Sequence, residues 1–245
     1  MSEHDPAAVD IEKVTPGQGL GNGFDRAAFP SLVLSTKRRV WGDPHPKELE
    51  PTVPDYLGAN LRRDVLAADG NRCMFCGLHS ASNEVHNLSD NHLDVRLENL
   101  RAVDPLCHAW HHLGELEADS AFIAYLPGLS GRDVNHLQRT IMVALQSDDQ
   151  AVREDAKTLL NWLASHRIYA KGTWGTYEPS VFAEAIARLD EQGRSNREVV
   201  FEGLAVVFNP GPYSQKAALW SREARSSAPI ENWSRIYHDV MHAAA

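Results

Sequence analysis

The three cysteines of the chain lie in two short stretches that together could bind a metal ion. Cys73 and Cys76 form a C-x-x-C pair in "RCMFCG", and Cys107 follows in "VDPLCHAWHH". A C-x-x-C pair on a tight turn places both sulfurs on one side of the backbone, which is half of a tetrahedral zinc site. Asp104 and Cys107 repeat the i, i+3 spacing, and a carboxylate is a legitimate, harder zinc ligand. The predicted zinc ligands are Cys73, Cys76, Asp104 and Cys107.

The identity of the fourth ligand stays open, because histidines surround Cys107. His108 and His111 are the alternatives to Asp104. The cysteines could also be small buried apolar residues that bind no metal, as free cysteines often are. An odd cysteine count with a close pair, in a chain with 12 histidines, nevertheless favours metal binding over disulfides.

Composition restricts the class of partner. The 24 basic and 33 acidic residues give a formal charge of −9, which repels a phosphate backbone. The stretch around the cysteines, residues 60 to 115, has five arginines against eight acidic residues. Nucleic-acid binding is therefore disfavoured. The N-terminus lacks a basic start followed by an apolar core, and no apolar run approaches the roughly 18 residues of a membrane span, so we expect a cytoplasmic protein without membrane insertion.

Several expected elements would position the cysteines. A helical stripe over residues 56 to 70 ends at Gly70 and leads directly into the C-x-x-C pair. Residues 122 to 127 predict a short strand, and Ser130 is the expected N-cap of the next helix. Further helices are expected over residues 149 to 168, 178 to 193, 214 to 224 and 230 to 243, while residues 197 to 213 are ambiguous between helix and strand.

These elements predict an α+β fold that is mostly α. Residues 1 to 30 are rich in Gly, Pro and charge, and indicate a flexible leader. Residues 31 to 55 contain a predicted strand, "LVLSTKRRVW", and a Pro-rich linker. A small zinc module over residues 56 to 115 is followed by a helical region, residues 116 to 245, that packs on it.

The pattern "RCMFCG…NEVHNLSDNHLD…LENLRAVDPLCH" resembles the HNH module, also called the ββα-metal or treble-clef module. The resemblance implies that the C-x-x-C pair forms the first knuckle and that Asp104 and Cys107 form the second. It also implies that His86 and Asn87 replace the family's H-H pair. The family's middle asparagine corresponds to Asn99, and its last histidine to His108.

In a working HNH nuclease, the first member of the H-H pair and the last histidine hold a divalent ion, and the second member is the general base. Asn87 occupies the base position, and an amide cannot accept a proton from water near neutral pH. His92 or His112 is a possible substitute. With the general base replaced by Asn87, we expect the protein to be non-catalytic and to have no catalytic residue. For a nuclease it implies the set His86, His92, Asn99 and His108.

A narrower resemblance is carried by "EVHNLSDNHLD", "PLCHAWHHL", "FIAYLPGLSGRDVNHLQRTI", "GTWGTYEPSVFAEAIARL" and "IENW". In order and spacing these segments resemble the IcmJ/DotN family of type IVB (Dot/Icm) secretion systems. The resemblance implies a non-catalytic zinc-binding adaptor that helps to recruit effector proteins. Its partners would be the type IV coupling ATPase and other coupling-complex subunits, which would hold it peripherally at the inner membrane. The alternatives are a metal-dependent HNH-type DNA endonuclease and a metal-bound accessory domain unrelated to secretion.

Overall fold

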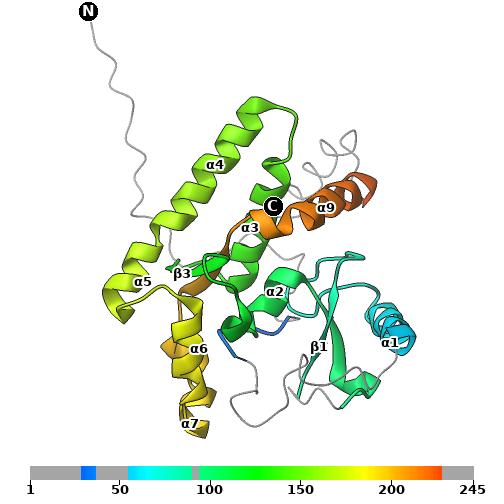
Figure 1. Cartoon of the computed structure of the whole chain (residues 1–245), viewed down its shortest axis with the longest axis horizontal. Helices are drawn as coiled ribbons and strands as arrows, with labels where there is room; N and C mark the ends of the chain where they lie inside the picture. The colour runs from blue at the N-terminus through cyan, green and yellow to red at the C-terminus, as the bar shows by residue number, and fades with distance from the viewer. Residues whose placement is uncertain (1–28, 37–54, 90–93, 228–245) are drawn as a thin grey trace, which may run out of the picture.

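The structure is a computed structural model that describes residues 29–36, 55–89 and 94–227 (Figure 1). These residues form an α+β fold that is mostly helical and contains two small antiparallel sheets, which confirms the predicted fold class. Figure 1 shows α2 (Pro105–Trp110) near the centre, between the side that carries α1 (Asp55–Ala68) and β1 (Glu84–Asn87) and the remaining helices. The candidate ligands lie on this central helix and the segments next to it.

The first sheet and α2 form a ββα unit. β1 pairs antiparallel with β2 (Leu100–Val103), with Glu84 opposite Val103 and Asn87 opposite Leu100. The single-turn 3-10 helix η4 (Leu97–Asn99) precedes β2. α2 begins directly after β2, because Asp104 accepts hydrogen bonds from two backbone N–H groups and Pro105 fills the first helical position. α1 packs against both strands, as its apolar stripe predicts.

A short knuckle joins α1 to β1. Gly70 has a φ of +58°, which ends the helix, and Arg72 and His79 form an isolated antiparallel bridge. Between them the backbone N–H of Cys73 donates to the oxygen of Leu78 at 2.9 Å, and that of Gly77 donates to the oxygen of Cys73 at 2.8 Å. Gly77 has a φ of +72°, in the left-handed region that favours glycine. The C-x-x-C pair therefore lies on a tight turn, as predicted.

The second sheet joins strands that are distant in sequence. β3 (Ala121–Tyr125) pairs antiparallel with β4 (Leu204–Phe208), with Ile123 opposite Val206. Every residue of β4 is buried, so this strand lies in the main core together with Trp110 of α2. The 3-10 helix η5 (Leu113–Glu115) lies between α2 and β3. The main core thus extends from the ββα unit into the helical region.

Helices cover this second sheet. α3 (Gly131–Ala144) begins at the predicted N-cap Ser130, packs against α4 (Gln150–Ser165) and contacts β4. α5 (Arg167–Trp174) and α6 (Pro179–Ala187) contact β3. The remaining elements are α7 (Glu191–Ser195), α8 (Arg197–Val200), the 3-10 helix η6 (Gly211–Tyr213) and α9 (Ser214–Ser227).

Three sequence predictions differ from the structure. Residues 32 to 36 form no strand; Ser35 instead exchanges backbone hydrogen bonds with Trp110 and Leu113, which hold this segment against the end of α2. The helix expected over 178 to 193 ends at Ala187, because the carboxylate of Asp190 caps a separate helix, α7. The helix expected over 149 to 168 ends at Ser165 and restarts as α5. The ambiguous segment, residues 197 to 213, contains both α8 and β4.

Other predictions fall on residues outside the described ranges. They are most of the leader, the Pro-rich linker from residue 37 onward, His92 and the helix expected over residues 230 to 243. Among the described helices, none is both long and apolar enough to cross a membrane.

Candidate metal centres

The structure brings the three cysteines together. Cys73 and Cys76 on the knuckle and Cys107 on α2 are all buried, and their sulfur atoms lie within 4.8 Å of one another. The connection between the two stretches is the β1–β2 hairpin, which returns the chain to the knuckle. This thiol cluster has the spacing and the donor atoms to hold a metal ion.

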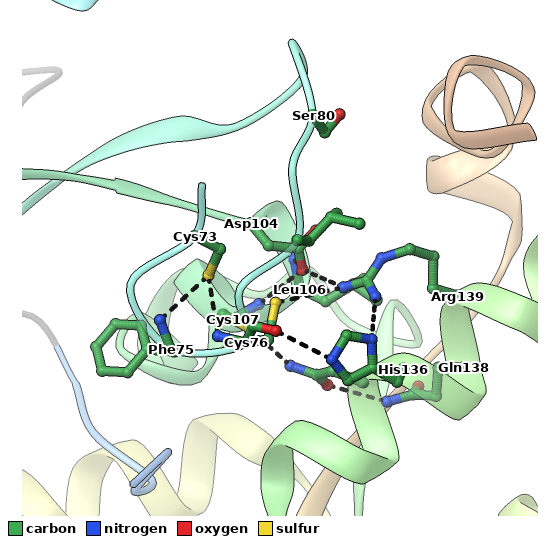
Figure 2. Close-up of polar contacts among 12 residues, drawn as sticks. Cys73, Phe75, Cys76, Ser80, Asp104, Leu106, Cys107, His136, Gln138 and Arg139 are labelled. Carbon is green, nitrogen blue, oxygen red and sulfur yellow. Dashed lines mark hydrogen bonds and ion pairs between the residues drawn. The ribbon is translucent and has the colours of Figure 1, made fainter. Parts of the chain in front are cut away.

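Each sulfur of the thiol cluster accepts a hydrogen bond from an N–H group. The backbone N–H groups of Phe75 and Cys76 donate to Cys73 Sγ, both at 3.4 Å, as Figure 2 shows. The side chain of Asn135 donates to Cys107 Sγ at 3.3 Å, and that of Arg139 donates to Cys76 Sγ at 3.8 Å. Donors at all three sulfurs stabilise negative charge, so the site suits thiolates, which are the metal-binding form of cysteine.

The pKa values of the thiols indicate how the charge is distributed. A hydrogen bond from Cys107 is the main reason why the pKa of Cys73 falls to about 2. Burial raises the pKa of Cys107 well above its usual value. Hydrogen bonding within the cluster therefore favours a thiolate, whereas burial opposes further negative charge. A bound cation would favour ionisation of the other thiols, so metal binding would release protons.

Asp104 lies beside the thiol cluster and has two functions in the fold. Its Oδ1 caps α2 by accepting hydrogen bonds from the backbone N–H of Leu106 at 3.0 Å and of Cys107 at 3.3 Å. The same oxygen forms an ion pair with Arg139 at 3.0 Å. Its Oδ2 is buried and has no hydrogen-bond partner. Burial raises the pKa of this carboxyl group, and the charge of Arg139 opposes that effect. Asp104 was a predicted ligand, but the group of ligand atoms that lie within 4.8 Å of one another contains only the three cysteines. Oδ2 is the carboxylate oxygen that remains for a metal ion beside this group.

α3 supplies the outer contacts of the thiol cluster. Figure 2 shows Arg139 and His136 extending from α3 toward the cysteines. Arg139 donates to His136 Nδ1 at 3.0 Å, so the hydrogen of this ring lies on Nε2, which donates to the backbone oxygen of Cys76 at 3.1 Å. Burial, and then the charge of Arg139, lowers the pKa of His136 and favours this neutral form.

Sequence reasoning missed this contribution of α3. The available signal was the set of polar residues within the buried face of the helix. Asn135, Gln138 and Arg139 are all buried there. Buried polar side chains need partners, so such a set predicts contact with a polar site.

Three histidines form a second cluster. His86 on β1, His108 on α2 and His112 just after α2 each offer a ring nitrogen, and these atoms lie within 4.8 Å of one another. The rings of His108 and His112 have centroids 4.5 Å apart, and those of His86 and His108 are 5.4 Å apart. This histidine cluster could hold a second metal ion. Sequence reasoning considered His112 only as a substitute base and missed it as a metal ligand, although its i, i+4 spacing from His108 is a known signal for two ligands.

A carboxylate orients one member of the histidine cluster. His108 Nδ1 lies 2.9 Å from Glu84 Oε2, and Lys216 Nζ on α9 donates to Glu84 Oε1 at 2.5 Å. Burial alone would raise the pKa of Glu84, but the hydrogen bonds from His108 and Lys216 outweigh it and lower the pKa to about 2. An ionised Glu84 accepts the hydrogen of Nδ1 and leaves Nε2 of His108 as the metal-binding atom.

His111 belongs to neither cluster of the described residues. Its ring stacks on Phe75 with centroids 4.7 Å apart, and its Nε2 is buried without a hydrogen-bond partner. Burial, followed by the charges of His108 and Arg197, lowers the pKa of His111 to about 4. The ring is therefore neutral near neutral pH, and it also lies against the ring of His86, with centroids 4.9 Å apart.

Asn87 and Asn99 brace the loop between β1 and β2. Asn87 Oδ1 accepts from the Ser89 hydroxyl and from Asn99 Nδ2, both at 3.0 Å. The Nδ2 atoms of Asn87 and Asn99 donate to the backbone oxygen of Asp94 at 3.2 and 2.9 Å. Asn99 Oδ1 accepts from the backbone N–H of Ser89 at 3.0 Å. Both amides are thus engaged in holding the loop. His92 lies in the part of this loop outside the described ranges.

Comparison with protein-family models and with curated proteins finds no match for this chain.

Proposed function

We propose that this chain is a non-catalytic, zinc-binding structural component of a type IVB secretion coupling complex. In this role it is an adaptor that helps to recruit effector proteins at the coupling ATPase. The observation that carries the non-catalytic assignment is the side chain of Asn87, which occupies the general-base position implied by the HNH resemblance. Both ends of that amide form hydrogen bonds within the loop.

Zinc is the metal proposed for the thiol cluster. Buried thiolates are soft ligands that select zinc, and a fully coordinated site contributes directly to folding. Cys73, Cys76 and Cys107 would supply three ligands, and Asp104 Oδ2 the fourth. The ion would join the knuckle to the N-terminus of α2, and Arg139 would offset part of the negative charge of the four ligands. The zinc would stabilise the fold without taking part in a reaction.

The secretion assignment rests on the sequence segments that resemble the IcmJ/DotN family, and on a ββα unit of the kind that the HNH resemblance implies. A protein of this kind acts through a partner. The coupling ATPase is the proposed partner, with other coupling subunits beside it and effector proteins bound indirectly. These partners would hold the chain at the inner membrane from the cytoplasmic side.

A metal-dependent HNH-type endonuclease is the second candidate, and the histidine cluster favours it. A divalent ion on His86, His108 and His112 would stabilise charge on the leaving oxygen of a phosphodiester. The base would have to come from a residue other than Asn87, and His92 is the sequence candidate. In this reading His86, His92 and His108 act with Asn99, which braces the loop. The acidic balance of residues 60 to 115 opposes binding of a polyanion.

A nicking assay separates these two functions. The full chain is incubated with supercoiled plasmid and Mg²⁺ or Mn²⁺, beside a His108→Ala variant and a mock purification from cells with the empty vector. We expect no cleavage above the mock sample. Cleavage by the wild type that His108→Ala abolishes would overturn the non-catalytic assignment.

The partner assignment is tested separately, by co-purification with the coupling ATPase of the same organism. Failure to recover that ATPase under conditions that keep the chain folded would count against it.

A further inference from the structure

A row of polar contacts connects the histidine cluster to the C-terminal helix α9. His108 on α2 contacts Glu84, the first residue of β1, and Glu84 contacts Lys216, which lies 132 residues later in the sequence. The two oxygens of Glu84 are divided between these partners, since Oε2 lies 2.9 Å from His108 Nδ1 and Oε1 lies 2.5 Å from Lys216 Nζ. The carboxylate is therefore fixed from both sides.

Two further contacts fix α9 on the same segment. Trp220 Nε1 donates to the Ser82 hydroxyl at 2.9 Å, and Glu223 Oε1 accepts from the backbone N–H of Ala81 at 2.9 Å. Lys216, Trp220 and Glu223 are spaced i, i+4 and i+7, so they share one face of the helix. α9 therefore docks on residues 81 to 84 along about two turns.

A carboxylate that accepts the Nδ1 hydrogen of a metal-binding histidine fixes its tautomer and ring orientation and makes Nε2 a stronger ligand. Lys216 restricts the rotamers of Glu84, and the docking of α9 restricts Lys216. The orientation of His108 thus depends on a helix that lies outside the ββα unit. Glu84 and Lys216 touch no other member of the two clusters in the described contacts.

We infer that Glu84 and Lys216 are positioning residues that set the metal affinity of the His86, His108 and His112 cluster and couple this affinity to the docking of α9. This inference rests on a metal site at the histidine cluster, which the second candidate function also uses. Because coupling between two equilibria is reciprocal, an ion at the histidine cluster strengthens the docking of α9 by the same factor. A partner that pulled α9 away would weaken metal binding at this cluster. It would also remove Trp220 from Arg139, whose guanidinium carbon lies 5.4 Å from the centroid of that ring, next to the thiol cluster.

Cobalt titration of the full chain tests this inference, because Co²⁺ bound to thiolates gives intense charge-transfer absorption that Co²⁺ bound to histidines lacks. The two clusters are therefore measured separately. The variants are Glu84→Leu, Lys216→Met and Lys216→Arg. The matched control is Lys157→Met, which removes the same charge from a lysine paired with Glu154 on the exposed side of α4.

We expect Glu84→Leu to weaken Co²⁺ binding at the histidine cluster about tenfold or more, the range for outer contacts of metal ligands. Lys216→Met should weaken it by about three- to tenfold, since its ion pair is half-exposed. Lys216→Arg and Lys157→Met should retain the wild-type affinity, and the thiolate absorption should be unchanged in all four variants. Glu84→Leu and Lys216→Met together should weaken binding no more than Glu84→Leu alone, because both act through the same carboxylate.

Two results would overturn the inference in distinguishable ways. If Lys216→Met binds Co²⁺ at the histidine cluster like the wild type, the relay through Glu84 is wrong although the site exists. If the wild type and His108→Ala bind the same amount of Co²⁺, the histidine cluster is not a metal site. The inference about Glu84 and Lys216 then fails as well.

Discussion

Arg139 on α3 and Asp104 at the N-terminus of α2 form an ion pair of 3.0 Å, with side chains that are only 7% and 0% exposed. The guanidinium also donates to Cys76 Sγ and to His136. The side chain of Arg139 therefore contacts both the knuckle, at Cys76, and the N-terminus of α2, at Asp104. This contact explains how an isolated carboxylate can be buried beside thiolates, since its charge is balanced from α3.

Replacing Arg139 with Met should destabilise the protein strongly. The change leaves Asp104 buried without its cationic partner, and breaking a buried pair in this way costs about 3–5 kcal/mol. The free energy of unfolding in urea measures the effect. Arg188→Met is the matched control, because Arg188 pairs with Glu184 on an exposed face of α6 and should contribute less than about 1 kcal/mol. Equal stability of the two variants would contradict this account of the pair.

Exchange of Asp104 tests the fourth ligand of the thiol cluster. Asp104→Asn keeps an oxygen for the cap of α2 but removes the carboxylate, so zinc should leave faster in the presence of a chelator. Asp104→Cys should retain zinc longer than the wild type, since thiolate is the softer ligand. The rate of zinc transfer to a chromophoric chelator measures both changes. If neither variant changes this rate, Asp104 is not a ligand.

Local patterns in the sequence predicted the parts of the site that depend on short spacing. The C-x-x-C turn and the N-cap at Ser130 each depend on neighbours within four residues. The histidine cluster was partly predictable, because His86 and His108 follow a family pattern to which His112 does not belong. Tertiary contacts were not predictable in this way. Arg139 is 35 positions after Asp104 and Lys216 is 132 positions after Glu84, and no local pattern specifies such pairs.

The same distinction applies to the fold. β4 is apolar throughout and has no alternation, so periodicity could not separate a buried strand from a helix at residues 204 to 208. The antiparallel pairing with β3 identifies this segment as a strand. The interruption at Asp190 was missed, because the cap signal lay within a segment whose apolar spacing still resembled one helix.

His111 should make the protein sensitive to mild acid. Its pKa is about 4 in the fold and 6.5 in the unfolded chain, so the unfolded state binds the proton first as the pH falls. The stability that neutral His111 confers is complete above about pH 6.5 and declines as the pH falls toward 4, by at most about 3 kcal/mol. Urea unfolding across this pH range gives the difference in the free energy of unfolding between the wild type and His111→Phe. Acid effects that are common to both proteins cancel in this difference. A constant difference over the range would contradict the assignment.

Asn87→His tests whether the base is the missing catalytic group. If the histidine cluster holds a divalent ion, this change returns an imidazole to the position of the general base, and weak plasmid nicking should appear. The loss of the hydrogen bonds to Ser89 and Asn99 should lower stability by about 1–3 kcal/mol. Asn87→Ala is the matched control, because it loses the same bonds without gaining a base. Equal nicking by the two variants, or by neither, would argue against a retained catalytic metal site.

The central claim is that the thiol cluster is a structural zinc site, and elemental analysis of the purified full chain tests it most directly. Wild-type protein passed through a chelator column should keep about one zinc per chain, because the ion would hold the knuckle to α2. The His108→Ala variant should keep the same zinc. Cys107→Ala should lose that zinc and become insoluble or sensitive to protease. Well-folded wild-type protein with far less than one zinc per chain would contradict the claim.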